Sequence, residues 1–296
     1  MVDSEKFKLA FAVWMQKTLQ NKIAGKTVAI DGKSICGTSK YTSSGEVLHI
    51  ASAIVSEFNL VIGSTECATK TGEITAFREL IELLDVNGAV VVADALHCNP
   101  KSAEAVIAAN ADYLFVVKDN QEILHKDLKL HFKDEAIDHQ TKEINGSRFE
   151  TRTAYVSYDV NYFNTKDKWP KLVTVGAIHR EFEEKGQKSS EWHYYISSKK
   201  LNGKELLHHA RMEWRVESMH WLLDVHFTED KSKVRDMNVE KLLNTSRKIA
   251  LNLVRLFKEA NCKPSLPLTS IFKQNLFDLA QFARFLAFFR LNLKLD

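Results

Sequence analysis

Residues 26–34 read Lys-Thr-Val-Ala-Ile-Asp-Gly-Lys-Ser, a short apolar run that ends on one acid followed directly by glycine. A strand buried on both faces of a sheet is a continuous apolar run rather than an alternating one, so residues 27–30 predict a central strand. The same pattern occurs at residues 89–94, where five apolar residues precede an acid. The sequence therefore predicts two buried strands that each end in a carboxylate, Asp31 in the first and Asp94 in the second.

Acids at the ends of two buried strands need a cation, hydrogen bonds or solvent nearby, because burying an unpaired carboxylate is costly. One divalent metal shared between Asp31 and Asp94 would meet this need. Mg²⁺ prefers oxygen ligands and is commonly held by one or two carboxylates together with substrate phosphate, which indicates phosphoryl transfer. The alternative interpretation is that Asp31 and Gly32 form a turn and that Asp94 caps the helix that follows.

The order of the predicted elements indicates the fold class. Three strands come first, followed by a helix, a strand, a second helix and a further strand. This order supports an α/β fold with a mixed sheet flanked by helices, which is the architecture of RNase H-like domains. The strands are predicted at residues 27–30, 47–56, 60–66, 89–93 and 113–117. The first helix is predicted to start at Thr71. The second is predicted to start at Pro100, with Asn99 as its cap.

Residues 118–190 are predicted to be a mostly β insertion between this sheet and the long helix that follows. The first part, up to about residue 150, is polar and has helical spacing around Leu124 and Leu128. Strand composition starts at Arg152, and a charged hairpin tip is expected at residues 181–190.

A long helix is predicted to follow the insertion. Residues three or four positions apart lie on one face of a helix, and Glu217 stands in the middle of an otherwise apolar stripe. Its position predicts a partner for the carboxylate, which is either a metal or, as the alternative, Arg211 or Arg152. Asp224 is the main rival for a ligand role, whereas Glu213 is expected on a more solvated side. The stripe consists of Leu206, Ala210, Trp214, Glu217, Trp221 and Val225.

The net charge of +3 and the pI of about 8.5 neither require nor exclude a nucleic-acid partner, so local charge must decide. Residues 231–258 carry eight cations against two acids, Asp236 and Glu240, within a helical pattern. Such a segment is expected to contact a phosphate backbone, and a solvated basic face is the alternative. The cations are Lys231, Lys233, Arg235, Lys241, Arg247, Lys248, Arg255 and Lys258.

Both ends of the chain are expected to be helical. Residues 4–20 form an amphipathic helix, and we expect it to be the edge of something larger. Residues 276–293 are too polar for a membrane span and predict a packed amphipathic helix. The four widely spaced cysteines favour neither a zinc ribbon nor a disulfide framework and suit a reducing cytosol, and no signal peptide is evident.

The chain resembles the DDE transposases of bacterial insertion sequences, most closely the H-repeat-associated family, along nearly its whole length. Many blocks in a fixed order carry the resemblance. They are Ala29-Ile30-Asp31-Gly32-Lys33, Glu73-Ile74-Thr75, Asp94-Ala95 with His97-Cys98-Asn99, Tyr113 with Lys118 and Asn120-Gln121, Tyr194-Tyr195-Ile196-Ser197-Ser198, Trp214-Arg215-Val216-Glu217, His220-Trp221-Leu222-Leu223-Asp224-Val225 and Glu229-Asp230.

The resemblance implies an RNase H-like domain that uses Mg²⁺ or Mn²⁺, held by Asp31, Asp94 and Glu217, to cleave DNA strands and transfer them. One metal would activate water or a DNA 3′-hydroxyl while the other stabilises the leaving oxygen. The implied partners are DNA, as element ends and target, and a second copy in a homodimer, with no membrane. The expected location is the bacterial cytoplasm, in association with the nucleoid.

The implied domain organisation is an N-terminal helix within residues 1–25 and a catalytic domain over residues 26–296. The insertion at about residues 118–190 and C-terminal helices at residues 231–296 belong to the catalytic domain.

The sequence departs from the family pattern in two ways. Related transposases often place Tyr and Arg before the third acid and Lys after it, whereas Ala210, Glu213 and Asp224 stand at those spacings. Arg211 and Arg215 substitute for the DNA contacts only by residue type. Members also usually carry a further segment before the first helix, so a non-catalytic, truncated DNA-binding remnant is the alternative to an active transposase, and a general nuclease of the same fold is a third hypothesis.

Overall fold

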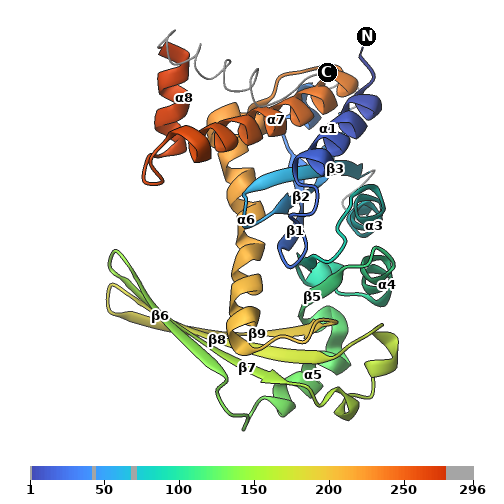
Figure 1. Ribbon diagram of the computed structural model, residues 1–296, viewed down its shortest axis with the longest axis vertical. Helices are drawn as coiled ribbons and strands as arrows, with labels where there is room; N and C mark the ends of the chain where they lie inside the picture. Colours follow the sequence, from blue (N-terminus) through green and yellow to red (C-terminus); the bar gives the residue numbers. More distant parts are fainter. Residues whose placement is uncertain (1, 42–44, 68–71, 278–296) are drawn as a thin grey trace.

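A computed structural model describes residues 2–41, 45–67 and 72–277, and these form one nine-stranded mixed sheet with helices packed on it (Figure 1). The strand order is β3-β2-β1-β4-β5-β9-β8-β7-β6. The strands are β1 (Thr27–Ile35), β2 (Leu48–Val55), β3 (Leu60–Cys67), β4 (Val90–Ala93), β5 (Asp112–Val117), β6 (His139–Asn145), β7 (Arg148–Ser157), β8 (Thr174–Glu184) and β9 (Gln187–Ser197).

The first five strands confirm the predicted RNase H-like arrangement. β1 pairs with β2 antiparallel and with β4 parallel, β2 pairs antiparallel with β3, and β4 pairs parallel with β5. The prediction that the first strand ends at Asp31 was wrong. Asp31 and Gly32 continue the antiparallel pairing with β2, opposite Ser52 and Ala51, so the strand runs on to Ile35 and the alternative of a turn at Asp31 is also wrong.

Helices cover both sides of this five-strand region. α3 and α4 lie on one side and α6 on the other (Figure 1). Asn99 caps α4 through the backbone N–H of Ser102, with Pro100 in the first turn, as predicted. The predicted start of α3 at Thr71 lies outside the described residues. The helices are α1 (Ser4–Thr18), α2 (Thr38–Tyr41), α3 (Glu73–Leu83), α4 (Pro100–Ala108), α5 (Glu122–His131), α6 (Gly203–Phe227), α7 (Met237–Asn261) and α8 (Leu268–Phe277). Short 3₁₀ helices occur at Ala95–His97, Asp119–Gln121, Val160–Tyr162, Lys166–Lys168 and Glu229–Lys231.

The β insertion continues the same sheet. β9 pairs antiparallel with β5, and β8, β7 and β6 follow as a meander of antiparallel strands. The sequence prediction missed β6, whose sequence His-Gln-Thr-Lys-Glu-Ile-Asn lacks an apolar run. The predicted end of the insertion at residue 190 falls inside β9, and the hairpin tip is tighter than expected because Lys185 and Gly186 turn the chain with positive φ.

The N-terminal helix α1 packs on β3 and α7. Phe11 and Met15 of this helix, and Leu19 directly after it, are buried in the main core, while Leu9 and Val13 are exposed. Asn252 of α7 fastens this layer to the sheet, because its side chain accepts a hydrogen bond from the backbone N–H of Val61 and donates one to the same residue's carbonyl.

No helix within residues 2–41, 45–67 and 72–277 is both long and apolar enough to cross a membrane. The predicted helix at residues 276–293 lies almost entirely outside these ranges.

Candidate active site

Asp31 and Asp94 lie side by side on neighbouring parallel strands. The pairing of β1 with β4 ends at Ile30 opposite Ala93, and each acid is the next residue along its chain. Asp94 accepts a hydrogen bond from the backbone N–H of Leu96, 3.0 Å away, and so caps the short 3₁₀ helix that follows β4. Asp31 and Asp94 are therefore neighbours at one end of the β1–β4 pairing, and the alternative interpretation that Asp94 caps the helix that follows is confirmed.

Further acids and two histidines surround this pair. His220 Nδ1 of α6 lies 3.4 Å from Asp31 Oδ2, and His97 Nε2 lies 3.9 Å from Asp94 Oδ1 and 3.4 Å from Glu73 Oε1. Burial raises the pKa of Asp94; the nearby His97 opposes this shift, while the negative charge of Asp31 adds to it. Within the described ranges, neither aspartate pairs with a lysine or arginine. The cluster therefore carries negative charge that the neighbouring side chains do not balance.

Gly32 permits the close approach of Glu73. A Cβ atom at residue 32 would lie 2.3 Å from the Glu73 carboxylate, which is much shorter than any real contact. Glycine directly after Asp31 thus makes room for a third acid beside the pair, and the coulombic effect of Glu73 also raises the pKa of Asp94.

Glu217 borders the same site but is exposed. It lines a pocket of about 770 Å³ together with Asp94 and Glu213. The prediction of a buried stripe was wrong for this half of α6, because the side chains of Trp214 and Trp221 are 58% and 61% exposed. Glu217 forms no hydrogen bond or ion pair with any residue that the structure describes. The alternative prediction, in which Glu217 pairs with Arg211 or Arg152, is therefore not observed. Arg211 and Arg152 instead pair with Glu143.

Glu213 is the acid of α6 that the sequence interpretation missed. It was expected on a solvated side, but it is largely buried and faces the aspartates. Burial raises the pKa of Glu213 to about 7, and the negative charges of Asp94, Asp31 and Glu217 contribute to the same shift. The available signal was the spacing of seven residues from Glu213 to His220, which places both on the face of α6 that meets β1.

Asp224 is held in a structural ion pair. Its carboxylate pairs with Lys33 of β1, and Lys33 Nζ also lies 3.1 Å from the buried Glu229. The rival for the ligand role is therefore already neutralised by a cation, two residues beyond Asp31 on the same strand.

The prediction that residues 231–258 form a basic surface was wrong for Arg247 and Lys248. Arg247 pairs with the buried Glu240 at 2.7 Å, and Lys248 is 1% exposed and donates to Asn244. Burial lowers the pKa of Lys248 to about 8. These side chains bind inside the protein because α7 packs against the sheet layer and buries this face. The cations that remain exposed at the start of the segment are Lys231, Lys233 and Arg235.

The residues at the aspartate pair fit a divalent cation by their chemistry. They supply only oxygen and imidazole donors and an excess of negative charge, which is what such a cation requires. The three predicted ligands do not all lie within 4.8 Å of one another, so the expected close convergence is not observed.

The profile of the "Transposase DDE domain" family matches residues 24–253. The chain belongs to the DDE transposase family. It is 34% identical to a "Putative transposase YncI" from Escherichia coli O157:H7, over 87% of this chain and 69% of that protein. It is 30% identical to an "H repeat-associated putative transposase YhhI" from Escherichia coli strain K12, over 86% of this chain and 70% of that protein.

A solved structure supports the fold of this DDE transposase. The piggyBac transposase, in a synaptic complex with hairpin DNA, superposes with a TM-score of 0.50 at 13% identity, over 95% of this chain and 57% of that one. The likeness agrees with the RNase H-like sheet. DDE transposases generally use divalent metal ions, which is consistent with the acidic cluster on β1, β4 and α6.

We predict that Glu213→Gln stabilises the metal-free chain at pH 8 but not at pH 5. The folded-state pKa of about 7 lies above the unfolded value of 4.5, so stability falls as pH rises between these values. The difference of about 2.5 pKa units corresponds to about 3 kcal/mol. Urea unfolding in EDTA at both pH values measures the gain. The exposed Glu104→Gln is the matched control, and an equal gain at pH 5 and pH 8 would contradict the assignment.

Proposed function

We propose that this chain acts as an insertion-sequence transposase that cleaves DNA strands and joins them to a target, with Mg²⁺ or Mn²⁺ held by Asp31, Asp94 and Glu217. The observation that carries the proposal is the position of Asp31 and Asp94 at the end of one parallel strand pairing, facing the acids of α6, in a chain of the DDE family. A bound divalent ion would supply Lewis-acid activation of phosphate and of the attacking hydroxyl.

Each ligand has a distinct role in this proposal. Asp31 is fixed by the central strand, and its carboxylate lies beside His220. Asp94 is oriented by the backbone N–H of Leu96. Glu217 is exposed and has no partner within the described part of the chain, so its side chain is free to turn toward the pair. Glu213 interacts electrostatically with all three ligands and, when ionised, adds to the negative potential that draws a cation to the site.

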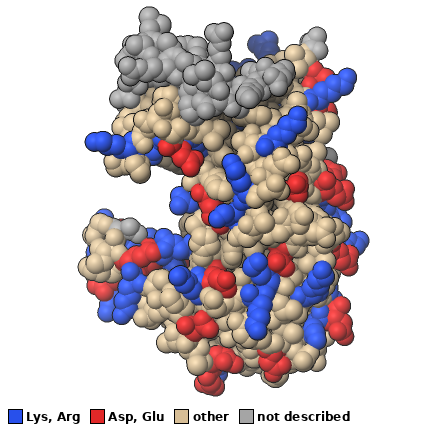
Figure 2. Space-filling view, viewed as in Figure 1, with Lys and Arg blue, Asp and Glu red and all other residues tan. Residues whose placement is uncertain are grey.

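The surface around the site fits DNA. Figure 2 shows a deep indentation on one side of the molecule, with lysine and arginine side chains on both of its edges. The pocket lining includes Lys118 and Arg215, which form no ion pair within the described part of the chain and suit a phosphate backbone. It also includes Arg180 and Arg211, which pair with glutamates of the β insertion. Exposed Trp214 adds an aromatic face on which an unpaired base could stack, and the guanidinium of Arg180 lies 5.8 Å from its ring centroid.

We predict that Asp31→Asn, Asp94→Asn and Glu217→Gln each abolish metal-dependent nicking of a supercoiled plasmid. Each change removes a charged ligand with little change in volume, and the loss should exceed the roughly 10–100-fold that removal of an outer-shell partner costs. Nicking rates in Mg²⁺ and in Mn²⁺ are compared with those in EDTA, and circular dichroism checks the fold. Glu104→Gln on the far side of the sheet is expected to keep full activity.

The same experiment distinguishes the alternatives. If Glu213→Gln or Asp224→Asn abolished nicking while Glu217→Gln did not, the third ligand would be reassigned. A native chain that binds DNA but shows no metal-dependent nicking would support the non-catalytic DNA-binding remnant. Cutting without joining to a target would favour a general nuclease of the same fold.

DNA binding is expected to depend on Arg215, which is exposed and lines the pocket. Log K should fall by about 0.9 per phosphate contact for each unit of log salt, so Arg215→Gln should reduce the slope by about that amount. Fluorescence anisotropy over a salt series measures the slope. Lys101→Gln, an exposed position on α4, is the control, and an unchanged slope in Arg215→Gln would remove this residue from the interface.

A further inference from the structure

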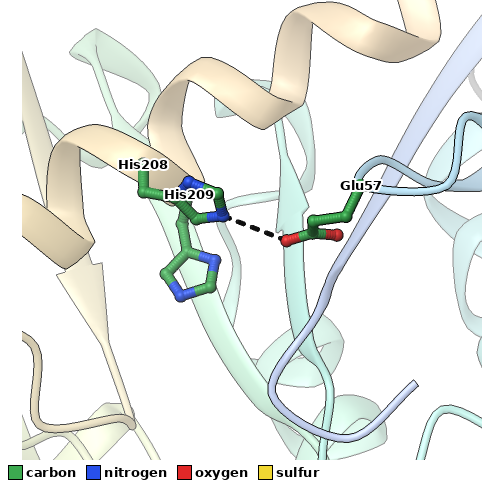
Figure 3. Close-up of side chains that lie close together, drawn as sticks. All are labelled: Glu57, His208 and His209. Carbon is green, nitrogen blue, oxygen red and sulfur yellow. Dashed lines mark hydrogen bonds and ion pairs between the residues drawn. The ribbon is translucent and has the colours of Figure 1, made fainter. Parts of the chain in front are cut away.

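Two histidines of α6 and one glutamate form a second candidate metal site (Figure 3). His208 and His209 lie in the second turn of α6, and Glu57 lies in the turn between β2 and β3. Each offers one ligand atom, and these atoms all lie within 4.8 Å of one another. In the part of the chain that the structure describes, this is the one group of three or more potential ligands that meets this distance.

Hydrogen bonds hold the glutamate in place. Both carboxylate oxygens of Glu57 accept from the backbone N–H of Thr27, at 3.0 and 2.9 Å, and Oε1 also accepts from the Thr27 hydroxyl at 2.8 Å. Burial opposes ionisation, but these hydrogen bonds outweigh it and keep the pKa of Glu57 below its usual value. Glu57 is thus an ionised carboxylate whose orientation is set by the first residue of β1.

One histidine meets this carboxylate directly, and the other meets Thr27 beside it. His208 Nε2 lies 3.1 Å from Glu57 Oε1. The Thr27 hydroxyl donates to Glu57, so it accepts from Nδ1–H of His209, 2.8 Å away, and Nε2 of His209 carries the free lone pair. His209 is 5% exposed, and burial lowers its pKa to about 4, so its imidazole is neutral at physiological pH. A neutral imidazole is the form that binds a metal.

The donor set differs from that of the aspartate site. Two imidazoles and one carboxylate are a known ligand set for zinc, whereas magnesium prefers oxygen ligands. Thr27 lies four residues before Asp31 on β1, which separates the two sites by about 13 Å along the strand. His208 has 46% of its side chain exposed, so the site is open to solvent on one side and leaves room for a fourth ligand.

We propose that Glu57, His208 and His209 bind one Zn²⁺ ion that joins the start of α6 to the start of β1. Thr27 would act as an outer-shell partner, since its N–H already orients the carboxylate. The ion would fix the end of α6 that lies before Glu213 and Glu217, and a water molecule would complete its coordination on the open side.

The test is zinc titration of the full metal-free chain by calorimetry, with millimolar Mg²⁺ present to occupy the carboxylate site. We expect one Zn²⁺ per chain, and a rise in Tm of roughly 5 °C when zinc is at about 100 times its Kd. His208→Gln and Glu57→Gln should each weaken zinc binding by roughly 10–100-fold or more. His208 is largely exposed, so its variant should fold, and its Tm without zinc checks this.

Two controls make the outcome decisive. His179→Gln, on β8 and outside the group of three ligands, should keep zinc binding unchanged. The double variant Asp31→Asn, Asp94→Asn should also keep it, whatever becomes of the nicking activity. Zinc binding that survives in His208→Gln but disappears in the double variant would place the ion at the aspartates and overturn the proposal, as would a native chain that binds no zinc at all.

Discussion

The packing of α6 along β1 determines how the functional residues meet. His209 contacts Thr27, His220 lies against Asp31, and Asp224 pairs with Lys33. These contacts follow the same order along both elements. The helix advances about 22 Å over the 15 residues from 209 to 224, and the strand advances about 20 Å over the six residues from 27 to 33. The helix therefore runs alongside the strand, and its acids at residues 213 and 217 lie between the His209–Thr27 contact and the His220–Asp31 contact.

This alignment concentrates negative charge in one place. Asp31, Asp94 and Glu213 are held near one another by backbone pairing and helix packing. Burial raises the pKa of Glu213, and the negative charges of Asp94 and Asp31 raise it further. Without a cation, placing these carboxylates close together is unfavourable, because their negative charges repel one another. Such local conflict is typical of functional sites, where a ligand of opposite charge compensates for it. Lys33 shows the contrast, because there the protein itself supplies a cation to the acids Asp224, Glu229 and Asp230.

The parts of the fold that local pattern controls could be predicted from the sequence. The apolar runs before Asp31 and Asp94, and the cap and proline at Asn99 and Pro100, each depend on neighbouring residues, and the five-strand order follows from them. The rotation of α6 about its axis could not be predicted, because long-range packing decides which of Glu213 and Glu217 faces the sheet. The burial of Lys248 likewise depends on how α7 packs, and a polar strand such as β6 gives no hydrophobic signal.

We expect the divalent cation to bind between β1, β4 and α6. Anomalous diffraction from a crystal soaked in Mn²⁺ can locate it, because the manganese signal does not depend on activity. A peak is expected between the carboxylates of Asp31 and Asp94, with metal–oxygen distances close to the roughly 2.1 Å known for Mg²⁺ and with a carboxylate of α6 turned toward it. Manganese bound elsewhere on the molecule, with Asp31 and Asp94 making no contact to it, would rule out this site.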